Sequence, residues 1–299
     1  MNKSTYWSAG HITAFFKIVD ESDDLLHKGS CGAGFNIKRG VVTEVTESKS
    51  STSNHHIYFG NKLQPRGTVG ITEYVIQQLG QMTPEEIPPL DIKYTFQAPI
   101  GAGFGTSAAG ALTTVFAINS FLKLDLPEIK LWQIAHKAEI TNKTGLGDIL
   151  GLYAKSKFEL RVKEGAPGIG IVNSPDLQTN DYDVYSYSLG PLSKKNILTD
   201  PIKRTIITKK GAESIELFKK NPTFENFCTL SVEFAKTIDL LPKKLWDIIN
   251  ALDASIKCSQ IMLGESLFFF VPKEMNFPSI GSLTPVQETL TDLTLQRIN

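Results

Sequence analysis

The sequence has few of the features that mark a specialised class of protein. It contains only 3 cysteines in 299 residues, and Cys31, Cys228 and Cys258 form no C-x-x-C pair. This odd number and wide spacing argue against a disulfide framework or a zinc site and favour a reducing, cytoplasmic location. No apolar run approaches the roughly 18 residues that a membrane-spanning helix needs, and the first residues lack the apolar core of a secretory signal.

An excess of charge of either sign is also missing, because 31 lysines and arginines balance 31 acidic residues. We therefore expect no nucleic-acid partner and no membrane partner, although a small anionic substrate is compatible with a neutral chain. The G-x-S-x-G and H-E-x-x-H signatures of two hydrolase classes are absent as well. The hydrophobic fraction of 41% is ordinary for a globular protein, and the length allows one large or two medium domains.

The most informative segment runs from Pro99 to Ala111 and places Gly101, Gly103 and Gly105 ahead of a Thr-Ser pair and an alanine-rich run. Glycine admits backbone angles that other residues avoid and leaves no side chain in the way of a ligand. A helix that begins here would direct free N–H groups and a partial positive charge at a phosphate. On this spacing alone, a phosphate loop and a plain strand-to-helix turn are about equally supported.

Two better-known phosphate-binding patterns do not fit this segment. A Walker loop needs a Gly-Lys-Ser/Thr run, and no lysine follows Gly105. The dinucleotide-binding pattern needs a third glycine at the position where Thr106 stands.

The periodicity of apolar residues predicts a chain of mixed helices and strands. Helices are expected at residues 69–79, 106–122, 127–141, 212–217, 224–238 and 242–254. Strands are expected at residues 6–19, 35–45, 57–59, 91–97, 158–162, 169–172, 184–188 and 204–208, with a hairpin formed by 259–263 and 267–271. Glycine-rich turns or loops are expected at residues 28–34 and 142–148.

Several motifs occur in an order that resembles a known family. They are Gly10-His11 on the first strand, the loop from Pro99 to Ser107, Glu139 near a helix end, Gly147-Asp148, and Met262-Leu263-Gly264. This order resembles the GHMP kinase superfamily, whose P-x-G-x-G-x-x-S-S/A signature the loop matches well. The third motif of the family, normally glycine-rich, is degenerate here, and Gly264 of Met262-Leu263-Gly264 is its main remaining residue. Within the superfamily, the first half of the chain is most similar to the archaeal pantoate kinases. The segments that carry this similarity are 10–16, 29–34, 99–111, 136–139 and 144–148.

The resemblance implies an α+β fold of two domains. The N-terminal domain, expected at residues 1–178, would be like domain 2 of ribosomal protein S5 and would carry the nucleotide loop and the catalytic residues. The C-terminal domain, expected at residues 179–299, would be ferredoxin-like. The resemblance also implies ATP and Mg²⁺ as cofactors and a small-molecule acceptor, and members of the family often form homodimers.

The resemblance assigns roles to individual residues. The ATP phosphates would be bound by Pro99, Gly101, Ala102, Gly103, Phe104, Gly105, Thr106 and Ser107. Ser107 and Glu139 would hold Mg²⁺, which prefers oxygen ligands, although Ser107 alone fits a helix N-cap better and Glu139 alone fits a solvated carboxylate. Asp148 would take the proton of the acceptor hydroxyl, although alone it fits a turn aspartate. In the family this aspartate lies near a lysine of the first motif, and Lys17 is the only nearby lysine here.

The acceptor implied by the resemblance is (R)-pantoate, phosphorylated on its primary hydroxyl. Ser30, His136 and Arg161 would be its substrate-binding residues. Ser30 fits an ordinary turn serine equally well, and a lone helix histidine such as His136 is often structural. Arg161 is chosen because its planar guanidinium suits a carboxylate, with Arg39 and Arg66 as the fallbacks.

Other functions stay open on the sequence alone. The same fold would serve a kinase for homoserine, mevalonate or shikimate, since all are small and hydroxylated. A non-catalytic ligand-binding sensor on the kinase scaffold is a further alternative, because a fold does not secure chemistry. The carboxylates at Glu139 and Asp148 argue against the sensor. The adenine contacts are placed at residues 54–61 from family position only.

Overall fold

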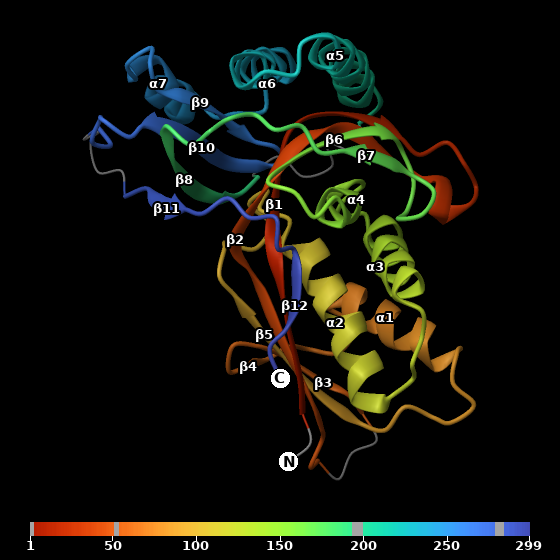
Figure 1. Cartoon of the computed structure of the whole chain (residues 1–299). Helices are drawn as coiled ribbons and strands as arrows, with labels where there is room; N and C mark the ends of the chain where they lie inside the picture. Colours follow the sequence, from red (N-terminus) through yellow and green to blue (C-terminus); the bar gives the residue numbers. More distant parts are fainter. Residues whose placement is uncertain (1–2, 51–53, 193–199, 279–283) are drawn as a thin grey trace.

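The computed structural model describes residues 3–50, 54–192, 200–278 and 284–299, which form two β-sheets with helices packed on both (Figure 1). The first sheet is built on a long antiparallel hairpin of β1 (Lys3–Val19) and β2 (Gly29–Glu47), joined through a short 3₁₀ turn at Leu25–His27. Its strand order is β12-β1-β2-β5-β3-β4, with β6 and β7 attached to the other half of β2. The remaining strands are β3 (His56–Phe59), β4 (Lys62–Leu63), β5 (Leu90–Phe96), β6 (Phe158–Lys163), β7 (Ile171–Asn173) and β12 (Leu295–Arg297).

The two long strands position the site because β2 changes partner along its length. Its residues 41–47 pair with β5, and its residues 32–35 pair with β6. The pairing of β1 with β2 is interrupted by register shifts at Ser8/Gly10 and Thr13/Phe15. Such irregularities bend a strand and redirect its side chains. His11 and Thr13 therefore lie where the sheet bends and its two halves separate.

The helices of the N-terminal half pack around one buried helix. α2 (Thr106–Leu122) contacts β1 and β2, and α1 (Gly70–Gly80) and α3 (Glu128–Asn142) contact α2 in turn. Residues 108–111 of α2 are alanine or glycine and fully buried, so the helix approaches the sheet closely. The short α4 (Asp148–Tyr153) follows and also contacts β1.

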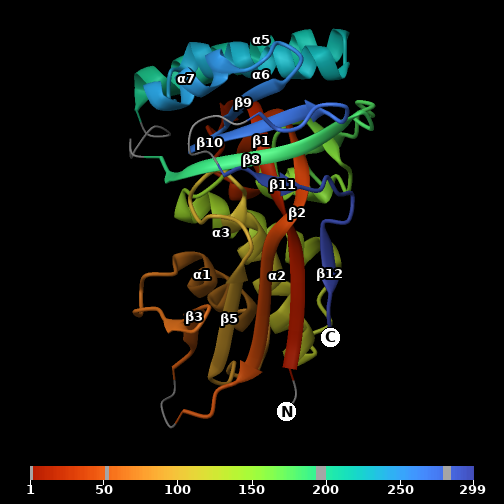
Figure 2. The same ribbon diagram turned by 90° about the vertical axis from the view of Figure 1, so that its left-hand side faces the viewer.

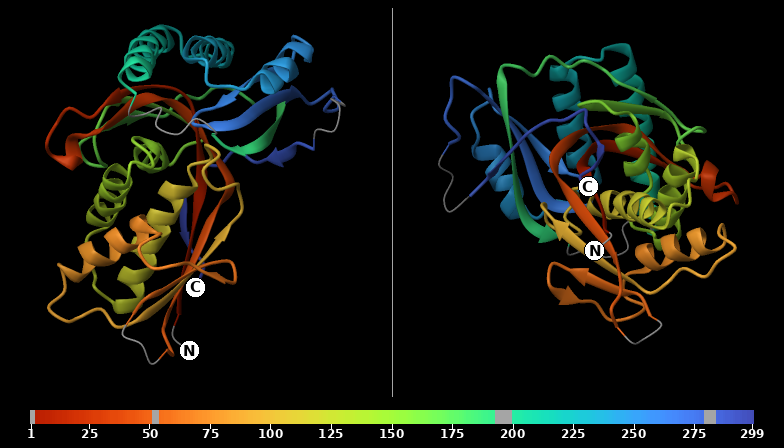
Figure 3. Two further views of the ribbon diagram at one scale, coloured as in Figure 1. Left: turned by 180° about the vertical axis from the view of Figure 1, so that it is seen from behind. Right: turned by 60° about the horizontal axis from the view of Figure 1, so that its bottom comes forward.

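The second sheet belongs to the C-terminal half of the chain. It has the antiparallel order β11-β8-β10-β9. Its strands and helices are β8 (Tyr182–Pro191), β9 (Lys257–Ile261), β10 (Gly264–Pro272), β11 (Val286–Glu288), α5 (Pro201–Lys220), α6 (Phe224–Ile238) and α7 (Lys243–Ala251). Seen from the side and from behind, these helices lie over the sheet and over the upper end of β1 (Figures 2 and 3).

Aromatic rings join the two sheets. Phe35 of β2 contacts Phe268 and Phe270 of β10 with ring centroids 5.2 and 5.6 Å apart, both edge-on. Phe158 of β6 and Phe227 of α6 complete the cluster. Edge-to-face rings add about 0.5–1.5 kcal/mol per pair beyond the apolar area that they bury. This buried cluster holds the second sheet against the site end of the first.

Residues 29–34 and 204–208 differ from the secondary structure expected for them. Residues 29–34 form the start of β2 rather than a turn, because Gly32 and Gly34 allow the backbone of β1 to approach closely, at Phe15 and Ile12. Residues 204–208 belong to helix α5 rather than to a strand. Asp200 caps this helix through the N–H groups of Ile202 and Lys203, and Pro201 follows at its first position, which favours a helix start over the local β propensity.

The chain passes from the first sheet to the second between β7 and β8, beside the expected boundary at residues 178 and 179. Strand β12 then returns to pair with β1 (Figure 2). The two-domain division stays a prediction. All three cysteines are free and buried. Within the described ranges, no helix is both long and apolar enough to cross a membrane.

Candidate active site

The glycine-rich segment forms a tight loop that leads directly into α2. Gly101, Gly103 and Gly105 have φ angles of 72°, 89° and 63°, in the left-handed region that favours glycine. Gly105 is the N-cap of α2, and no side chain caps the helix. The N–H groups of the first turn are therefore free for an anion, as expected for a phosphate loop.

The second sheet supports this loop from behind. A Cβ on Gly103 would lie 2.5 Å from the carbonyl oxygen of Met262, and Gly264 packs as closely on Ala102. The Ser266 hydroxyl donates a hydrogen bond of 2.9 Å to the Ala102 carbonyl. The segment Met262-Leu263-Gly264 thus packs on the glycine loop through backbone contacts. These contacts form although this segment has fewer glycines than the third motif of the family.

Replacing Gly103 by Ala is expected to destabilise the protein by about 3 kcal/mol and to weaken ATP binding, because the new Cβ meets backbone at a positive φ. Gly60→Ala is the matched control, since Gly60 has a φ of +59° with nothing within 4 Å of an added Cβ. It should cost about 1 kcal/mol from backbone strain alone. Urea unfolding and ATP titration of both variants measure the difference, and equal losses would contradict the close contact.

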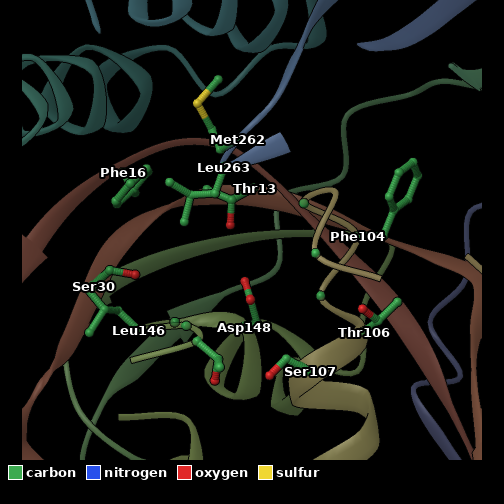
Figure 4. Close-up of a pocket in the computed structure, with 16 residues that line it drawn as sticks. Thr13, Phe16, Ser30, Phe104, Thr106, Ser107, Leu146, Asp148, Met262 and Leu263 are labelled. Atoms are coloured by element: carbon green, nitrogen blue, oxygen red, sulfur yellow. The ribbon is translucent and has the colours of Figure 1, made fainter. Parts of the chain in front are cut away.

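A pocket opens between this loop, α4 and the end of β9. It is lined by Thr13, Phe16, Ser30, Gly101, Gly103, Phe104, Gly105, Thr106, Ser107, Thr144, Gly145, Leu146, Gly147, Asp148, Met262 and Leu263. The Thr13, Ser30 and Ser107 hydroxyls and the Asp148 carboxylate turn toward one shared space, which apolar side chains border from above and from the left (Figure 4). One cavity thus combines a phosphate loop, a carboxylate and an apolar wall.

Ser107 and Glu139 have the donor atoms that Mg²⁺ prefers. Among the described residues the buried Ser107 hydroxyl has no hydrogen bond of ordinary geometry, although it lies close enough to Glu139 to act to lower the pKa of that carboxyl, and it does not cap α2. Glu139 is 2% exposed, so it is not a solvated helix carboxylate. Its Oε1 accepts a hydrogen bond from Thr144, and no described residue hydrogen-bonds its Oε2 with ordinary geometry. Burial and the nearby charge of Asp148 raise the pKa of Glu139 to about 7. Orphaned oxygens beside a phosphate loop fit a Mg²⁺ ion shared with phosphate.

Asp148 lies at the floor of the pocket as the first residue of α4, where the sequence predicted a loop. Its side chain is 23% exposed, and its Oδ1 is 2.9 Å from Nδ1 of His11. Burial acts to raise the pKa of Asp148, but the hydrogen bond and charge of His11, with the charge of Arg161, outweigh it and lower the pKa. A Cβ at Gly145 would lie 3.1 Å from both the Asp148 Oδ2 and the Glu139 carboxyl carbon, so the two acids face the same glycine.

His11 is a site residue to which the sequence assigns no role. The resemblance places a lysine of the first motif beside Asp148. In the structure, Nδ1 of His11 lies 2.9 Å from the Asp148 carboxylate. The signal in the sequence is the histidine that follows Gly10 on β1, because a histidine can carry a positive charge.

Ser30 and Arg161 lie side by side beneath Gly147. A Cβ at Gly147 would clash with the Ser30 hydroxyl and lie 2.7 Å from Nη1 of Arg161. Arg161 is fully buried on β6, with Nη2 3.4 Å from the Thr13 hydroxyl and Nε 3.6 Å from Glu159. Its Nη1 has no hydrogen-bond partner in the part of the chain that the structure describes. An unpaired guanidinium nitrogen behind a glycine, next to a pocket hydroxyl, is suited to an acidic ligand.

His136 does not line this pocket. It is 1% exposed, and its Nε2–H faces the carbonyl oxygens of Leu25 and Lys28 at 3.3 and 3.1 Å. It therefore secures the turn between β1 and β2, and its contact with substrate stays a prediction. The fallback residues lie elsewhere: Arg39 pairs with Glu288 at 2.7 Å, and Arg66 lines a separate surface hollow.

Burial lowers the pKa of His136 to about 4. As the pH falls, His136 of the unfolded chain is protonated near pH 6.5, whereas in the folded protein it stays neutral until about pH 4. The contribution of His136 to the free energy of unfolding is therefore fully present above pH 6.5 and is lost as the pH falls toward 4. Between pH 7.5 and pH 5.0, His136 should account for a loss of about 2 kcal/mol in the free energy of unfolding.

In urea unfolding at both pH values, His136→Gln should remove this part of the difference. His27→Gln, at an exposed histidine of the adjacent turn, is the control and should retain the wild-type difference. An unchanged difference in His136→Gln would contradict a neutral buried histidine.

A second, more apolar pocket adjoins the phosphate loop. It shares Gly101, Thr106, Ser107 and Thr144 with the first pocket. Its walls include Phe59, Val69, Ile71, Phe96 and Ile100. Of the residues placed beforehand near adenine, 54–61, only Phe59 lies in this wall.

The fold and the site together define a kinase of the GHMP type. The family model for the N-terminal domain of GHMP kinases matches residues 68–155, which include the loop, Glu139 and Asp148. A mevalonate diphosphate decarboxylase from Staphylococcus aureus shares the fold at 11% identity, with a TM-score of 0.68 over 100% of this chain and 98% of that one. The predicted GHMP kinase fold is thereby confirmed.

Relatives of higher sequence identity show to which branch of the GHMP kinases the chain belongs. The pantoate kinase of Thermococcus kodakarensis is 34% identical over 267 residues, covering 88% of this chain and 86% of the relative. That of Methanocaldococcus jannaschii is 33% identical, covering 90% and 93%. A solved "phosphotransferase related to CoA biosynthesis pathway" matches at a TM-score of 0.84 and 30% identity over 99% of this chain and 98% of that one. The chain belongs to the pantoate kinase family of GHMP kinases.

Proposed function

We propose that this protein transfers the γ-phosphoryl group of ATP to the primary hydroxyl of (R)-pantoate, giving 4-phosphopantoate and ADP in archaeal coenzyme A biosynthesis. The observation that carries the proposal is the Asp148 carboxylate, partly exposed in a pocket that also contains the free N-terminus of α2. A base and a phosphate cradle in one cavity are the parts that phosphoryl transfer to an alcohol requires. The names of the full-length relatives supply the acceptor.

The nucleotide would extend across both pockets. The N–H groups from Gly101 to Ser107 would bind the β- and γ-phosphates, with the positive end of α2 behind them. The adenine would lie in the apolar pocket between Phe59, Phe96 and Ile100, since the two pockets share the loop. Mg²⁺ held by Ser107 and Glu139 would neutralise charge on the transferring phosphoryl group.

The acceptor would lie between the loop and β2. Asp148 accepts the proton of the primary hydroxyl as its oxygen bonds to the γ-phosphorus and the bond to the β,γ-bridging oxygen breaks. Arg161 and Ser30 would bind the carboxylate of pantoate. The apolar side chains of Phe16 and Leu146 would contact its methyl groups and exclude water.

A coupled ADP-release assay with pantoate, homoserine, mevalonate and shikimate tests the proposal. ADP release with pantoate, at a kcat/KM at least about 100-fold above the other acceptors, is the expected result. Turnover with another acceptor and none with pantoate would overturn the acceptor assignment. No turnover with any of them, together with ATP binding, would favour the sensor.

Two further expectations stay predictions. Gel filtration with light scattering tests the homodimer, and fractionation of the source cells tests the cytoplasmic location.

A further inference from the structure

We propose that His11 is a positioning residue that remains a buried imidazolium and holds Asp148 ionised and oriented, with Glu159 at its other ring nitrogen. The inference deepens the proposed function and rests on it. In this chain the His11 imidazolium, paired with the buried carboxylate of Glu159, would stabilise the ionised form of Asp148, as a lysine next to the catalytic aspartate would.

The hydrogen bonds of the ring carry the argument. His11 is fully buried, its Nδ1 is 2.9 Å from the Asp148 carboxylate, and its Nε2 is 3.1 Å from Oε1 of Glu159. An ionised carboxylate only accepts hydrogen bonds, and a neutral imidazole has a single N–H to donate. Two carboxylate partners are therefore satisfied together only when both ring nitrogens carry a proton.

Glycines hold the ring in place. A Cβ at Gly34 would lie 3.0 Å from Nε2 of His11, and one at Gly105 would lie 3.0 Å from its Cβ. A Cβ at Gly151 of α4 would overlap the ring itself. Backbone from β2, the phosphate loop and α4 thus packs against His11, so the ring cannot turn away from Asp148 without displacing one of these elements.

The surrounding charges agree with this assignment. Asp148 of α4 and Glu159 of β6 contact the ring, Arg161 of β6 contacts Glu159, and Glu139 of α3 is the remaining acid whose charge interacts with His11. Burial acts to lower the pKa of His11, but the hydrogen bonds and charges of Asp148 and Glu159 outweigh it and raise the pKa. His11 and Arg161 bring two positive charges to a cluster that holds the carboxyl groups of Asp148, Glu159 and Glu139, so the charge of His11 is compensated, as burial requires.

The arrangement assigns the protons during turnover. The proton that leaves the acceptor hydroxyl goes to Asp148, while His11 keeps both of its own. His11 therefore touches neither substrate nor phosphate and acts through Asp148.

Two substitutions separate positioning from packing. In His11→Asn the amide nitrogen lies near the place of Nδ1 and keeps a donor toward Asp148. In His11→Gln it lies near the place of Nε2 and keeps a donor toward Glu159 instead. We expect kcat to fall about 100-fold in His11→Gln and only about 10-fold in His11→Asn, with both KM values within about 3-fold of the wild type. Equal losses in kcat, or a loss confined to KM, would overturn the proposal.

Glu159→Gln tests the charge without touching Asp148. Imidazole nitrogen NMR of the ligand-free protein should show both His11 nitrogens protonated from pH 6 to pH 8 in the wild type, with His11→Asn identifying the signals. In Glu159→Gln the proton should be lost at a lower pH, and the basic limb of the kcat profile, where His11 loses its proton, should move downward in pH. Glu213→Gln, on an exposed face of α5, is the control and should match the wild type in both measurements.

A neutral His11 in the wild-type spectrum would overturn the inference whatever the acceptor is. Failure of the wild type to phosphorylate pantoate would overturn the proposed function instead, and the NMR titration would still decide the charge of His11.

Discussion

Asp148→Asn is expected to lower kcat about 1,000-fold, because the amide cannot accept the proton of the attacking hydroxyl. The substitution keeps the size of the side chain, and α4 begins at this residue without needing its charge for a cap. ATP affinity should stay within about 3-fold of the wild type, since the phosphates would be bound by backbone N–H groups. Steady-state ADP release and ATP titration measure the two quantities.

The control for this variant is Asp247→Asn, at an exposed residue of α7 that pairs with Lys243 on the protein surface. It should retain wild-type kcat. A kcat for Asp148→Asn within about 10-fold of the wild type would contradict its role as the base and leave catalysis to orientation by the loop.

Arg161→Lys is expected to raise the KM for pantoate between about 10- and 100-fold with a smaller effect on kcat. A lysine keeps the positive charge beside Glu159, so the buried carboxylate is not left uncompensated. It lacks the planar fork needed to reach Thr13, Glu159 and a substrate carboxylate together. The KM for ATP should be unchanged.

Neopentyl glycol, which has the dimethyl hydroxymethyl group of pantoate but no carboxylate, supplies the control for Arg161. Wild type and Arg161→Lys should phosphorylate it with the same, poor kcat/KM, because the guanidinium would have nothing to bind. An equal loss on both acceptors would contradict the carboxylate role and assign Arg161 to the packing of β6 beside Gly147.

Local pattern was enough for much of the nucleotide half of the site. The predicted helix at residues 106–122 matches α2 at both ends, and the glycines before it have the positive φ angles that the phosphate loop required. Glycine at those positions is a backbone requirement that can be read without knowing the fold. The roles of Ser107 and Glu139 came from the family resemblance, and in the structure Ser107 lines the pocket while Glu139 lies against Gly145 of its wall.

Local pattern failed where contacts between distant segments decide the conformation. Residues 204–208 have a β-branched composition, yet they form part of α5, where Gly211 packs on the backbone of Phe16. The glycines at residues 29–34 suggested a turn but serve close strand packing in β2. A glycine can be required either for a positive φ angle or for the close approach of another backbone. The sequence does not distinguish these two requirements, because only the neighbours of the glycine in space do so.

The sequence by itself determined the glycine loop and the start of the helix after it, because glycine spacing and a helix start are properties of neighbouring residues. Only the tertiary structure decided the partner of the base. His11 and Asp148 are 137 positions apart, and the pair forms because β1 bends beside α4 at the point where β2 changes from β5 to β6. The tertiary structure also places His136 beneath the β1–β2 turn, where it hydrogen-bonds the Lys28 carbonyl oxygen, and it buries Arg161 next to Ser30. The pKa and the hydrogen bonds of an ionisable side chain depend on the groups packed around it, and the whole fold sets that packing.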